Sequence, residues 1–365
     1  MSIDMFLNKI VNAENRKELD IRKLSESTLP LVIYGAGNLA LGIMKLLNRH
    51  KIKIDAACVD AEFIRSDSCS VLGVKVTTIE NICKKYDNFN VLIGFADYDK
   101  ARNKLKNIQN VVSAIFIDDV LHHLEFFNYQ YITEHLNDFE FTYNLLQDQL
   151  SKDIFIAYIN AKISGEPDGL YELMDKNQYF NDLIQFGNHE VFVDCGAFDG
   201  DTIIRFHKKM GGNYKKIYAF EPDEHNYCRL QRTIVENEIK HVHTINKGCW
   251  DKKDVLLFSS DANMASTVSL QGDFSIEVDT IDNIVGQEIV TFLKMDIEGS
   301  ELAALRGAEK TIKKSKPKLA ICVYHKPEDL ITIPQFISSL VPEYKFFLRH
   351  HQYISTETVL YAIIT

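Results

Sequence analysis

Three carboxylates in the second half of the chain follow apolar, strand-like runs directly. Asp194, Glu221 and Asp296 each stand where such a run ends. Because parallel strands of an open α/β sheet end at one edge, where ligands bind, we expect these acids to line a common crevice. The acids Asp194, Asp199 and Asp201, at and just after the end of the first of these runs, would repel a pyrophosphate but would suit a ligand with an ammonium, a sulfonium and ribose hydroxyls. Glu221 could accept two hydrogen bonds from a ribose diol.

A glycine-rich turn separates the first two of these acids. The segment DCGAFDGDT (194–202) leaves the strand and leads into a helix that we expect to begin at Thr202. Gly196 and Gly200 would let the backbone approach a ligand closely. Their GxxxG spacing differs from the GxGxxG spacing of dinucleotide-binding loops, and Asp199 adds a further negative charge. The turn therefore indicates a binding loop for a ligand that carries positive charge.

A second set of polar side chains follows the later strands. Asp296 begins a turn that contains Glu298, and Glu301 opens the next helix. His325 follows a strand-like run two strands later, and histidine is the side chain best suited to accept a proton near neutral pH. Two simpler interpretations stay open, because Glu301 could merely favour the helix dipole and a lone histidine is usually structural. Asp296, Glu298 and His325 could also gather a divalent metal, but no tight ligand spacing supports this, so we expect no metal.

The first half carries a pattern typical of nucleotide binding. A strand-like run at 31–34 leads into Gly35-Ala-Gly37-Asn38, and an acid, Asp60, ends the next strand. This arrangement predicts a second nucleotide site, with glycines near the phosphates and the acid on a ribose. Nothing after it suggests hydride chemistry. The glycines could instead only permit close packing of helix and strand.

Strand-like runs alternate with helical periodicity on both sides of a helical segment. This predicts an α/β protein with two Rossmann-like, doubly wound domains. We expect a helix within residues 1–29, a nucleotide-binding-type domain at 30–120, a helical connector or lid at 121–188, and a second domain at 189–365. Two closing runs, at 344–348 and 358–364, predict an antiparallel hairpin at the sheet edge.

Composition excludes several classes of protein. The 365 residues include 41 basic and 51 acidic ones, for a net charge of -10, so nucleic acids and anionic membranes are unlikely partners by charge. The seven cysteines are scattered without a CxxC pair, which argues against a disulfide framework or a structural zinc site. No signal peptide and no apolar run of membrane-spanning length are evident. We expect a soluble, cytoplasmic protein.

Five blocks of the second half together resemble one enzyme family. VFVDCGAFDGDT, YAFEP, VDTID, FLKMDIEGSELAALRGA and LRHHQYISTETVLYA occur in the order found in FkbM-type methyltransferases, a branch of the S-adenosylmethionine-dependent class I fold. The resemblance covers about residues 190–365. Its most specific part is KMDIEGSE (294–301), which matches K-x-D-x-E-G-x-E. It implies a seven-stranded sheet whose last hairpin is antiparallel.

The resemblance also implies the cofactor and its site. Asp194, Gly196 and Gly200 would surround the methionine part of S-adenosylmethionine, Glu221 would bind its ribose, and adenine would lie near 248–251. The remaining cofactor-binding candidates belong to the same two loops: Ala197, Phe198, Asp199, Thr202 and Pro222. The pair Phe198-Asp199 departs from the smaller or amide-bearing pair of many relatives, which would retune the methionine pocket.

The implied reaction is methyl transfer to oxygen, on a hydroxyl of a sugar, a nucleotide-sugar or a related small metabolite. His325 or Asp296 would take the hydroxyl proton, and Glu298 and Glu301 would orient the acceptor. His350 and His351, in the closing hairpin, are second-line candidates. The first half would recognise a nucleotide or organise a homodimer. Two alternatives stay open: an NAD-dependent oxidoreductase centred on the N-terminal GxGxxA, and a non-catalytic nucleotide-binding protein.

Overall fold

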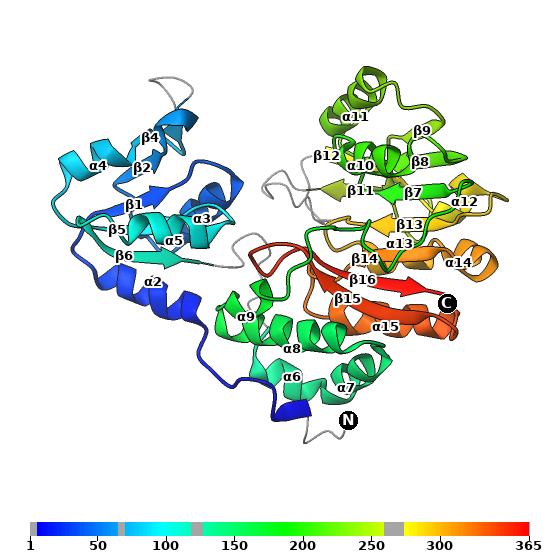
Figure 1. Cartoon of the computed structure of the whole chain (residues 1–365), viewed down its shortest axis with the longest axis horizontal. Coiled ribbons are helices and arrows are strands. Elements are labelled where there is room, and N and C mark those ends of the chain that lie inside the picture. The colour runs from blue at the N-terminus through cyan, green and yellow to red at the C-terminus, as the bar shows by residue number, and fades with distance from the viewer. Residues whose placement is uncertain (1–5, 65–69, 118–126, 259–273, 365) are drawn as a thin grey trace.

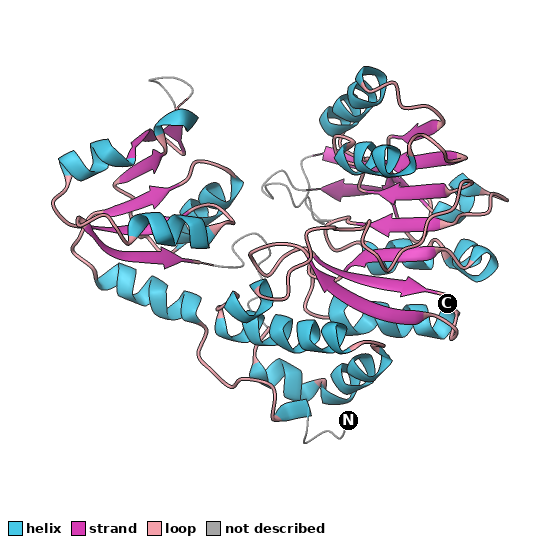
Figure 2. Ribbon diagram, viewed as in Figure 1, coloured by secondary structure: helices cyan, strands magenta, loops and turns pink. Residues whose placement is uncertain are grey.

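The computed structural model of the chain describes residues 6–64, 70–117, 127–258 and 274–364 (Figure 1). Two sheets with separate hydrophobic cores dominate these residues, and a helical segment lies between them in sequence (Figure 2). This confirms the predicted α/β class with two Rossmann-like sheets. No helix in the described ranges is both long enough and apolar enough to cross a bilayer.

The first sheet has the strand order β3-β4-β2-β1-β5-β6, and all of its pairs are parallel except β3 with β4. Its strands are β1 (Leu31–Tyr34), β2 (Ala56–Val59), β3 (Ser70–Val71), β4 (Val74–Thr78), β5 (Phe89–Ile93) and β6 (Val111–Phe116). The parallel strands alternate with α3 (Asn38–Arg49), the 3-10 turn η1 (Ala61–Phe63), α4 (Ile79–Lys85) and α5 (Tyr98–Leu105). Strands β1, β2 and β5 are buried along their whole length, as expected of a parallel sheet covered on both faces.

The leading helix is shorter than the sequence predicts. Helix α2 spans Arg16–Glu26, and Asn15 caps it by accepting a hydrogen bond from the Lys17 amide. The preceding residues join the other core, where Phe6 packs edge-on against Tyr143. Helix α2 lies within the range 1–29 in which we expect a helix but fills only part of it, because the apolar positions of this stretch are divided between two cores.

The middle helices form a layer against the second sheet. They are α6 (Tyr129–Glu134), α7 (Leu136–Leu145), α8 (Gln149–Ser164) and α9 (Asp168–Tyr171). Helix α8 packs on strand β15 (Lys345–His350), where Ser151 accepts a hydrogen bond from the Leu348 amide and Asp148 pairs with Arg349 at 2.6 Å. Phe139 and Phe155 are fully buried in the same core as the strands of the second sheet. These helices are thus packed structure rather than a free lid.

The second sheet has seven strands in the order β15-β16-β14-β13-β7-β8-β9. Besides β15 they are β7 (Val191–Cys195), β8 (Lys216–Phe220), β9 (Val242–Ile245), β13 (Phe292–Met295), β14 (Lys318–Cys322) and β16 (Thr358–Ile363). Strand β16 is antiparallel to both neighbours, which confirms the expected terminal hairpin. The direction of winding reverses between β7 and β13, so this is the point at which an open α/β sheet offers a crevice.

Six helices connect these strands: α10 (Asp201–Met210), α11 (Glu224–Glu236), α12 (Ile281–Val285), α13 (Glu301–Arg306), α14 (Glu309–Ser315) and α15 (Asp329–Leu340). The runs near 255 and 275 do not enter the main sheet. They form β11 (Asp254–Phe258) and β12 (Phe274–Asp279), which pair antiparallel in a small sheet with β10 (Gly248–Cys249).

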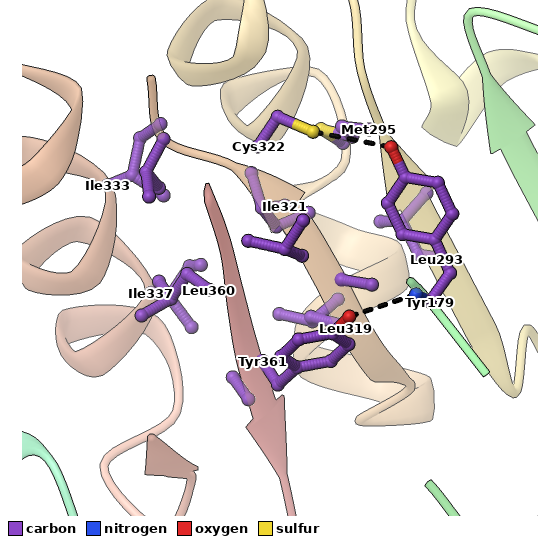
Figure 3. Close-up of a cluster of buried hydrophobic side chains, with 14 of the residues drawn as sticks. Tyr179, Leu293, Met295, Leu319, Ile321, Cys322, Ile333, Ile337, Leu360 and Tyr361 are labelled. Atoms are coloured by element: carbon purple, nitrogen blue, oxygen red, sulfur yellow. Dashed lines mark hydrogen bonds between the residues drawn. The ribbon is translucent and has the colours of Figure 1, made fainter. Parts of the chain in front are cut away.

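Buried side chains hold together the strands that carry the crevice. Figure 3 shows Leu293 and Met295 of β13 beside Leu319 and Ile321 of β14. Tyr361 of β16 accepts a hydrogen bond from the backbone amide of residue 179 at 2.9 Å, which ties the middle segment to the sheet. The carboxyl ends of β13 and β14 are therefore fixed by close packing.

Candidate active site

Four polar side chains stand at or just beyond the carboxyl ends of neighbouring strands. Asp194 lies in β7, Glu221 follows β8, Asp296 follows β13 and His325 comes three residues after β14. In the sheet register, Asp194 pairs with Ala219 of β8 on one side and with a β13 residue on the other. The topology therefore brings these groups to one edge, around the reversal between β7 and β13.

Gly196 is required by a close approach of two backbones. Its φ of 82° lies in the left-handed region, and a Cβ on it would stand 2.0 Å from the carbonyl oxygen of Asp296. Gly200 also has a positive φ, of 90°, at the N-terminus of α10. The glycine-rich turn therefore packs closely against the turn that follows β13, and this contact fixes the two loops relative to each other.

We expect Gly196→Ala to destabilise the protein by about 2–3 kcal/mol, because the new methyl group must push the Asp296 carbonyl away and a side chain is strained at this φ. Urea denaturation followed by tryptophan fluorescence measures this change. Gly211→Ala is the matched control, since Gly211 also has a positive φ but a Cβ there would meet open space. Equal losses of stability in the two variants would contradict the role assigned to the close approach.

A buried ion pair underlies the glycine-rich turn. Lys294 Nζ lies 3.0 Å from Asp194 Oδ1 and donates a hydrogen bond of 2.8 Å to the Gly196 carbonyl. The side chains of Lys294 and Asp194 are 3% and 0% exposed. Burial raises the pKa of Asp194 to about 6, although Lys294 opposes the shift. Asp194 therefore lies below the glycine-rich turn, away from solvent, and supports the turn through its ion pair with Lys294.

Glu221 connects the first two loops. One of its oxygens accepts a hydrogen bond of 2.8 Å from the Phe198 amide, and the other accepts one of 3.0 Å from the Asp223 amide. The residue is only 6% exposed, and burial raises its pKa to about 7 despite these two bonds. Each carboxylate oxygen keeps a further lone pair, so Glu221 can still accept hydrogen bonds from a diol.

The other candidates of these loops differ in what they contact. Asp199 forms an ion pair with Arg229, whose guanidinium also lies 5.2 Å from the centre of the Phe198 ring. Ala197 and Thr202 are buried, whereas Phe198 is 40% exposed. Pro222 lines a cavity of about 800 Å³ together with residues of the α11 N-terminus, Asn246 and residues 275–277. Asp199 is thus neutralised by a side chain that lies outside the turn.

The acceptor-side candidates form one connected cluster. His325 Nδ1 lies 2.9 Å from Glu301 Oε1, while His325 Nε2 lies 3.4 Å from Asp296 Oδ1 and 3.5 Å from Glu298 Oε2. The two Asp296 oxygens accept hydrogen bonds from the hydroxyls of Tyr179, at 2.9 Å, and of Tyr324, at 3.0 Å. The structure therefore brings all four predicted side chains together around one imidazole.

The four side chains of this cluster differ in their exposure to solvent, and the difference indicates their roles. The side chains of His325 and Glu301 are 2% and 0% exposed, whereas those of Asp296 and Glu298 are 24% and 34% exposed. Glu301 Oε1 also accepts a hydrogen bond from the Ile297 amide, so Glu301 orients His325 instead of an acceptor. Asp296 and Glu298 are the groups that a bound molecule can reach.

The electrostatics of the cluster follow from this crowding of acids. Burial disfavours a charge on His325, but Glu301, Asp296 and Glu298 together raise its pKa to about 10. Burial would raise the pKa of Asp296, yet Lys294 and His325 hold it below its ordinary value. Burial raises the pKa of Glu298 to about 7. The site thus has an excess of negative groups that favours bound positive charge.

Comparison with known proteins relates the second half of the chain to a protein family. Residues 194–355 match the family model of the methyltransferase FkbM domain. Residues 194–355 form a methyltransferase FkbM domain. This confirms the predicted family and, with it, a methyltransferase that uses S-adenosylmethionine as its cofactor. No curated protein matches the chain.

A solved structure that is similar to nearly the whole chain shares its fold. The methyltransferase FkbM from Methylobacillus flagellatus KT is 24% identical, with 98% of each chain covered and a TM-score of 0.72. An rRNA methylase from Streptococcus thermophilus is 18% identical over 49% of this chain and 89% of its own, with a TM-score of 0.33. A putative methyltransferase from Streptococcus mutans in complex with SAH is 14% identical over 48% of this chain and 88% of its own, with a TM-score of 0.32.

The two histidines of the closing hairpin do not belong to the cluster around His325. His350 Nδ1 lies 2.9 Å from the Thr358 hydroxyl, and His351 contacts the Asp175 carbonyl at 2.6 Å and the Tyr361 hydroxyl at 2.9 Å. Burial lowers the pKa of His350 to about 3 and that of His351 to about 4. Both are packed, neutral side chains that hold the hairpin.

Several residues that contact the predicted site residues were not identified from the sequence. Lys294 stands in the most specific motif, yet its pairing with Asp194 is visible only once β7 and β13 are neighbours. Tyr324 forms a 3.2 Å hydrogen bond with Glu357 as well as one with Asp296, so Glu357 is a further acid of this cluster. Asp329 accepts a hydrogen bond from the Lys326 amide, and burial raises its pKa to about 8. An acid beside a buried strand end was the only available signal.

The glycines of the first half have unequal roles. A Cβ on Gly35 would lie 2.6 Å from the Gly94 carbonyl oxygen, so its φ of 130° serves the packing of β1 against β5. Gly37 caps α3, which begins at Asn38, and a Cβ there would meet nothing within 4 Å. Asp60 Oδ1 accepts hydrogen bonds from the Tyr34 hydroxyl and from Lys104. Oδ1 of the acid predicted to bind a ribose therefore already has two internal partners.

Proposed function

We propose that the protein is an O-methyltransferase that acts on a hydroxyl of a sugar, a nucleotide-sugar or a related small polyol. The observation that carries this proposal is the partly exposed pair of carboxylates, Asp296 and Glu298, beside the glycine-rich turn. Ionised carboxylates accept hydrogen bonds only, so they suit an acceptor that presents several hydroxyl donors.

The cofactor site in this proposal consists of the two loops after β7 and β8. The turn from Gly196 to Gly200 would receive the methionine part of S-adenosylmethionine, and Glu221 would bind the ribose diol. Adenine would lie in the cavity next to Pro222, near Asn246, whose amide donates a 2.9 Å hydrogen bond to the Glu221 carbonyl. The sulfonium would then face the acid-rich side of the crevice, where its positive charge is favoured.

The reaction is an in-line displacement. The acceptor oxygen forms a bond to the methyl carbon while the carbon–sulfur bond breaks, and S-adenosylhomocysteine leaves. The hydroxyl proton leaves toward the carboxylates of Asp296 and Glu298, because His325, whose pKa is raised to about 10, already carries its proton. Alignment of oxygen, carbon and sulfur is the protein's main contribution, and the packed ends of β7 and β13 provide it.

Calorimetric titration with S-adenosylmethionine and S-adenosylhomocysteine tests the cofactor site. We expect Glu221→Gln to bind both ligands about 10- to 100-fold more weakly, since a charge-assisted hydrogen bond to the ribose is lost. Gly37→Asp, which alters the other glycine-rich loop in open space, should leave both affinities unchanged. Undiminished binding in Glu221→Gln together with weakened binding in Gly37→Asp would move the cofactor to the first half.

The acceptor class is tested by methyl transfer from labelled S-adenosylmethionine to a panel of free sugars, nucleotide-sugars, amines and peptides. We expect label in methyl ethers of the hydroxyl-rich compounds. Label found only in amines or peptides would contradict transfer to oxygen. NAD belongs in the same binding titration, and we expect no binding because Gly35 serves the packing of β1 against β5 and Asp60 Oδ1 already has two internal partners.

We also propose a cytoplasmic location. The six cysteines within the described residues are all free: Cys58, Cys83, Cys195, Cys228, Cys249 and Cys322. Unpaired thiols are typical of a reducing compartment.

A further inference from the structure

The hydroxyl of Tyr324 lies between two carboxyl groups of the crevice. Its oxygen is 3.0 Å from Asp296 Oδ1 and 3.2 Å from Glu357 Oε1. A hydroxyl has one proton and donates to one partner at a time, whereas an ionised carboxylate can only accept. With both acids ionised, one of the two contacts would place a lone pair of the hydroxyl against a negative oxygen. Both contacts are satisfied only if one of the two carboxyl groups holds a proton and donates it to Tyr324.

Neighbouring charges determine which of the two acids holds this proton. Burial would raise the pKa of Asp296, but Lys294 and His325 hold it below its ordinary value. Burial raises the pKa of Glu357 to about 7, and the nearby charge of Asp296 adds to this rise. When two acids share a site, the one with less support for its charge keeps the proton, and here that acid is Glu357.

We propose that Glu357 is a positioning residue, whose protonated carboxyl group donates to the Tyr324 hydroxyl and thereby directs the proton of that hydroxyl to Asp296. The second oxygen of Glu357 accepts a hydrogen bond from the Gln178 side chain, which fixes the plane of the carboxyl group. Asp296 then keeps both of its hydroxyl donors, Tyr324 and Tyr179. The inference rests on the proposed function, in which Asp296 faces the hydroxyl of the acceptor.

The backbone at Glu357 supports a functional role for this side chain. Its φ of 62° lies in the left-handed region, where a glycine would be free of strain. Tyr179, Phe198 and Glu298, which also belong to the site, have positive φ values as well. Strained residues of this kind persist where the surrounding structure holds them, and they are concentrated at functional sites. The chain thus keeps a carboxyl group at a position where the backbone favours glycine.

The groups that face Glu357 determine how its positioning role depends on pH. The ionisable ones are Tyr179, Asp296, Glu298, Cys322, Tyr324 and His325. Burial raises the pKa of both tyrosines and of the cysteine, so these three stay neutral. Above about pH 7, Glu357 loses its proton, and the single proton of Tyr324 is then shared between two carboxylates. Glu298 titrates in the same range, so variants are compared with the wild-type protein at each pH.

Glutamine and glycine at position 357 test the proposal. Glutamine has the shape of a protonated glutamate, because its amide nitrogen can donate to Tyr324 while its oxygen accepts from Gln178. We expect Glu357→Gln to keep kcat within about twofold at about pH 6 and to retain more of its kcat than the wild-type protein at about pH 9. Glu357→Gly suits the positive φ but lacks the carboxyl group, so we expect it to lose about three- to tenfold in kcat with an unchanged affinity for S-adenosylmethionine.

Two further variants separate positioning from a general structural effect. Glu238→Gly is the matched control, since Glu238 is an exposed acid that also has a positive φ, of 51°, and we expect it to keep the wild-type kcat. Adding Glu357→Gly to Tyr324→Phe should cause no further loss, because Glu357 acts through the Tyr324 hydroxyl. Losses that multiply in the double variant would overturn the proposal. So would a loss in Glu357→Gln as large as that in Glu357→Gly, because an ionised carboxylate would then be the active form.

Infrared spectroscopy tests the proton without any acceptor. A protonated carboxyl group has a C=O stretch at a higher frequency than amides and carboxylates. The difference spectrum between the wild-type protein and Glu357→Gln, both folded by circular dichroism, should contain this band at about pH 6 and lose it by about pH 9. Absence of the band would overturn the proposal. The band together with no methyl transfer to any hydroxyl would contradict only the proposed function.

Discussion

Replacing Lys294 with methionine is expected to lower the free energy of unfolding by about 3–5 kcal/mol. Methionine fills a similar volume but leaves Asp194 as a buried carboxylate without its cation, and breaking a buried pair on one side has about this cost. The loss also removes the hydrogen bond that Lys294 donates to the Gly196 carbonyl at 2.8 Å. The single tryptophan, Trp250, lies in the same domain, so its fluorescence during urea denaturation reports the relevant transition.

Two further variants separate the ion pair from a general effect of losing a lysine. Lys313→Met breaks a surface pair with Glu309, whose members are 52% and 40% exposed, and should change stability by less than about 0.5 kcal/mol. The double variant Asp194→Asn with Lys294→Met should recover at least half of the loss, because no buried charge remains. A loss below about 1 kcal/mol in Lys294→Met would show that the pair does not stabilise the domain.

The sequence predicted the parts of this site that depend on strand ends. An apolar run followed by an acid is a local pattern, and the parallel topology then places Asp194, Glu221 and Asp296 at one edge. Gly196 was also identifiable, although as a residue that approaches a ligand. The structure adds that its missing side chain leaves room for the Asp296 carbonyl. The local sequence pattern therefore identified Gly196 as an important position but did not identify the Asp296 carbonyl as its contact.

The contacts that determine each side chain's role are long-range. Tyr179, which binds Asp296, comes 117 residues earlier in the chain, in a helical segment without any catalytic pattern. Asp199 is neutralised by Arg229, 30 residues later, on α11. Such pairings follow from how strands and helices pack, and a single sequence carries no periodic signal for them.

The loop between β15 and β16 gives the first half a connection to the active site. Tyr353 and Ile354 of this loop pack with the core of the first sheet, and Tyr353 stacks on Tyr171 with ring centres 4.9 Å apart. Three residues further, Glu357 forms the 3.2 Å hydrogen bond with Tyr324. The same short loop therefore contacts one domain and completes the acid cluster of the other.

Replacing Asp296 with asparagine is expected to lower kcat for methyl transfer at least about 100-fold, while the dissociation constant of S-adenosylmethionine changes less than about threefold. The substitution keeps the shape but removes the charge that faces the acceptor and its hydroxyl proton. Asparagine can accept a hydrogen bond on only one atom, so it also loses the bond from either Tyr179 or Tyr324.

Tyr324→Phe distinguishes these two effects. It removes one hydrogen bond to Asp296 but keeps the carboxylate, so a loss of kcat below about tenfold is expected from imperfect orientation alone. Steady-state rates at saturating cofactor and acceptor give both values. Equal losses in the two variants would mean that orientation, not charge, is the contribution of Asp296. A kcat within about fivefold of the wild-type value in Asp296→Asn would remove Asp296 from the reaction, and Glu298 would then have to accept the proton without it.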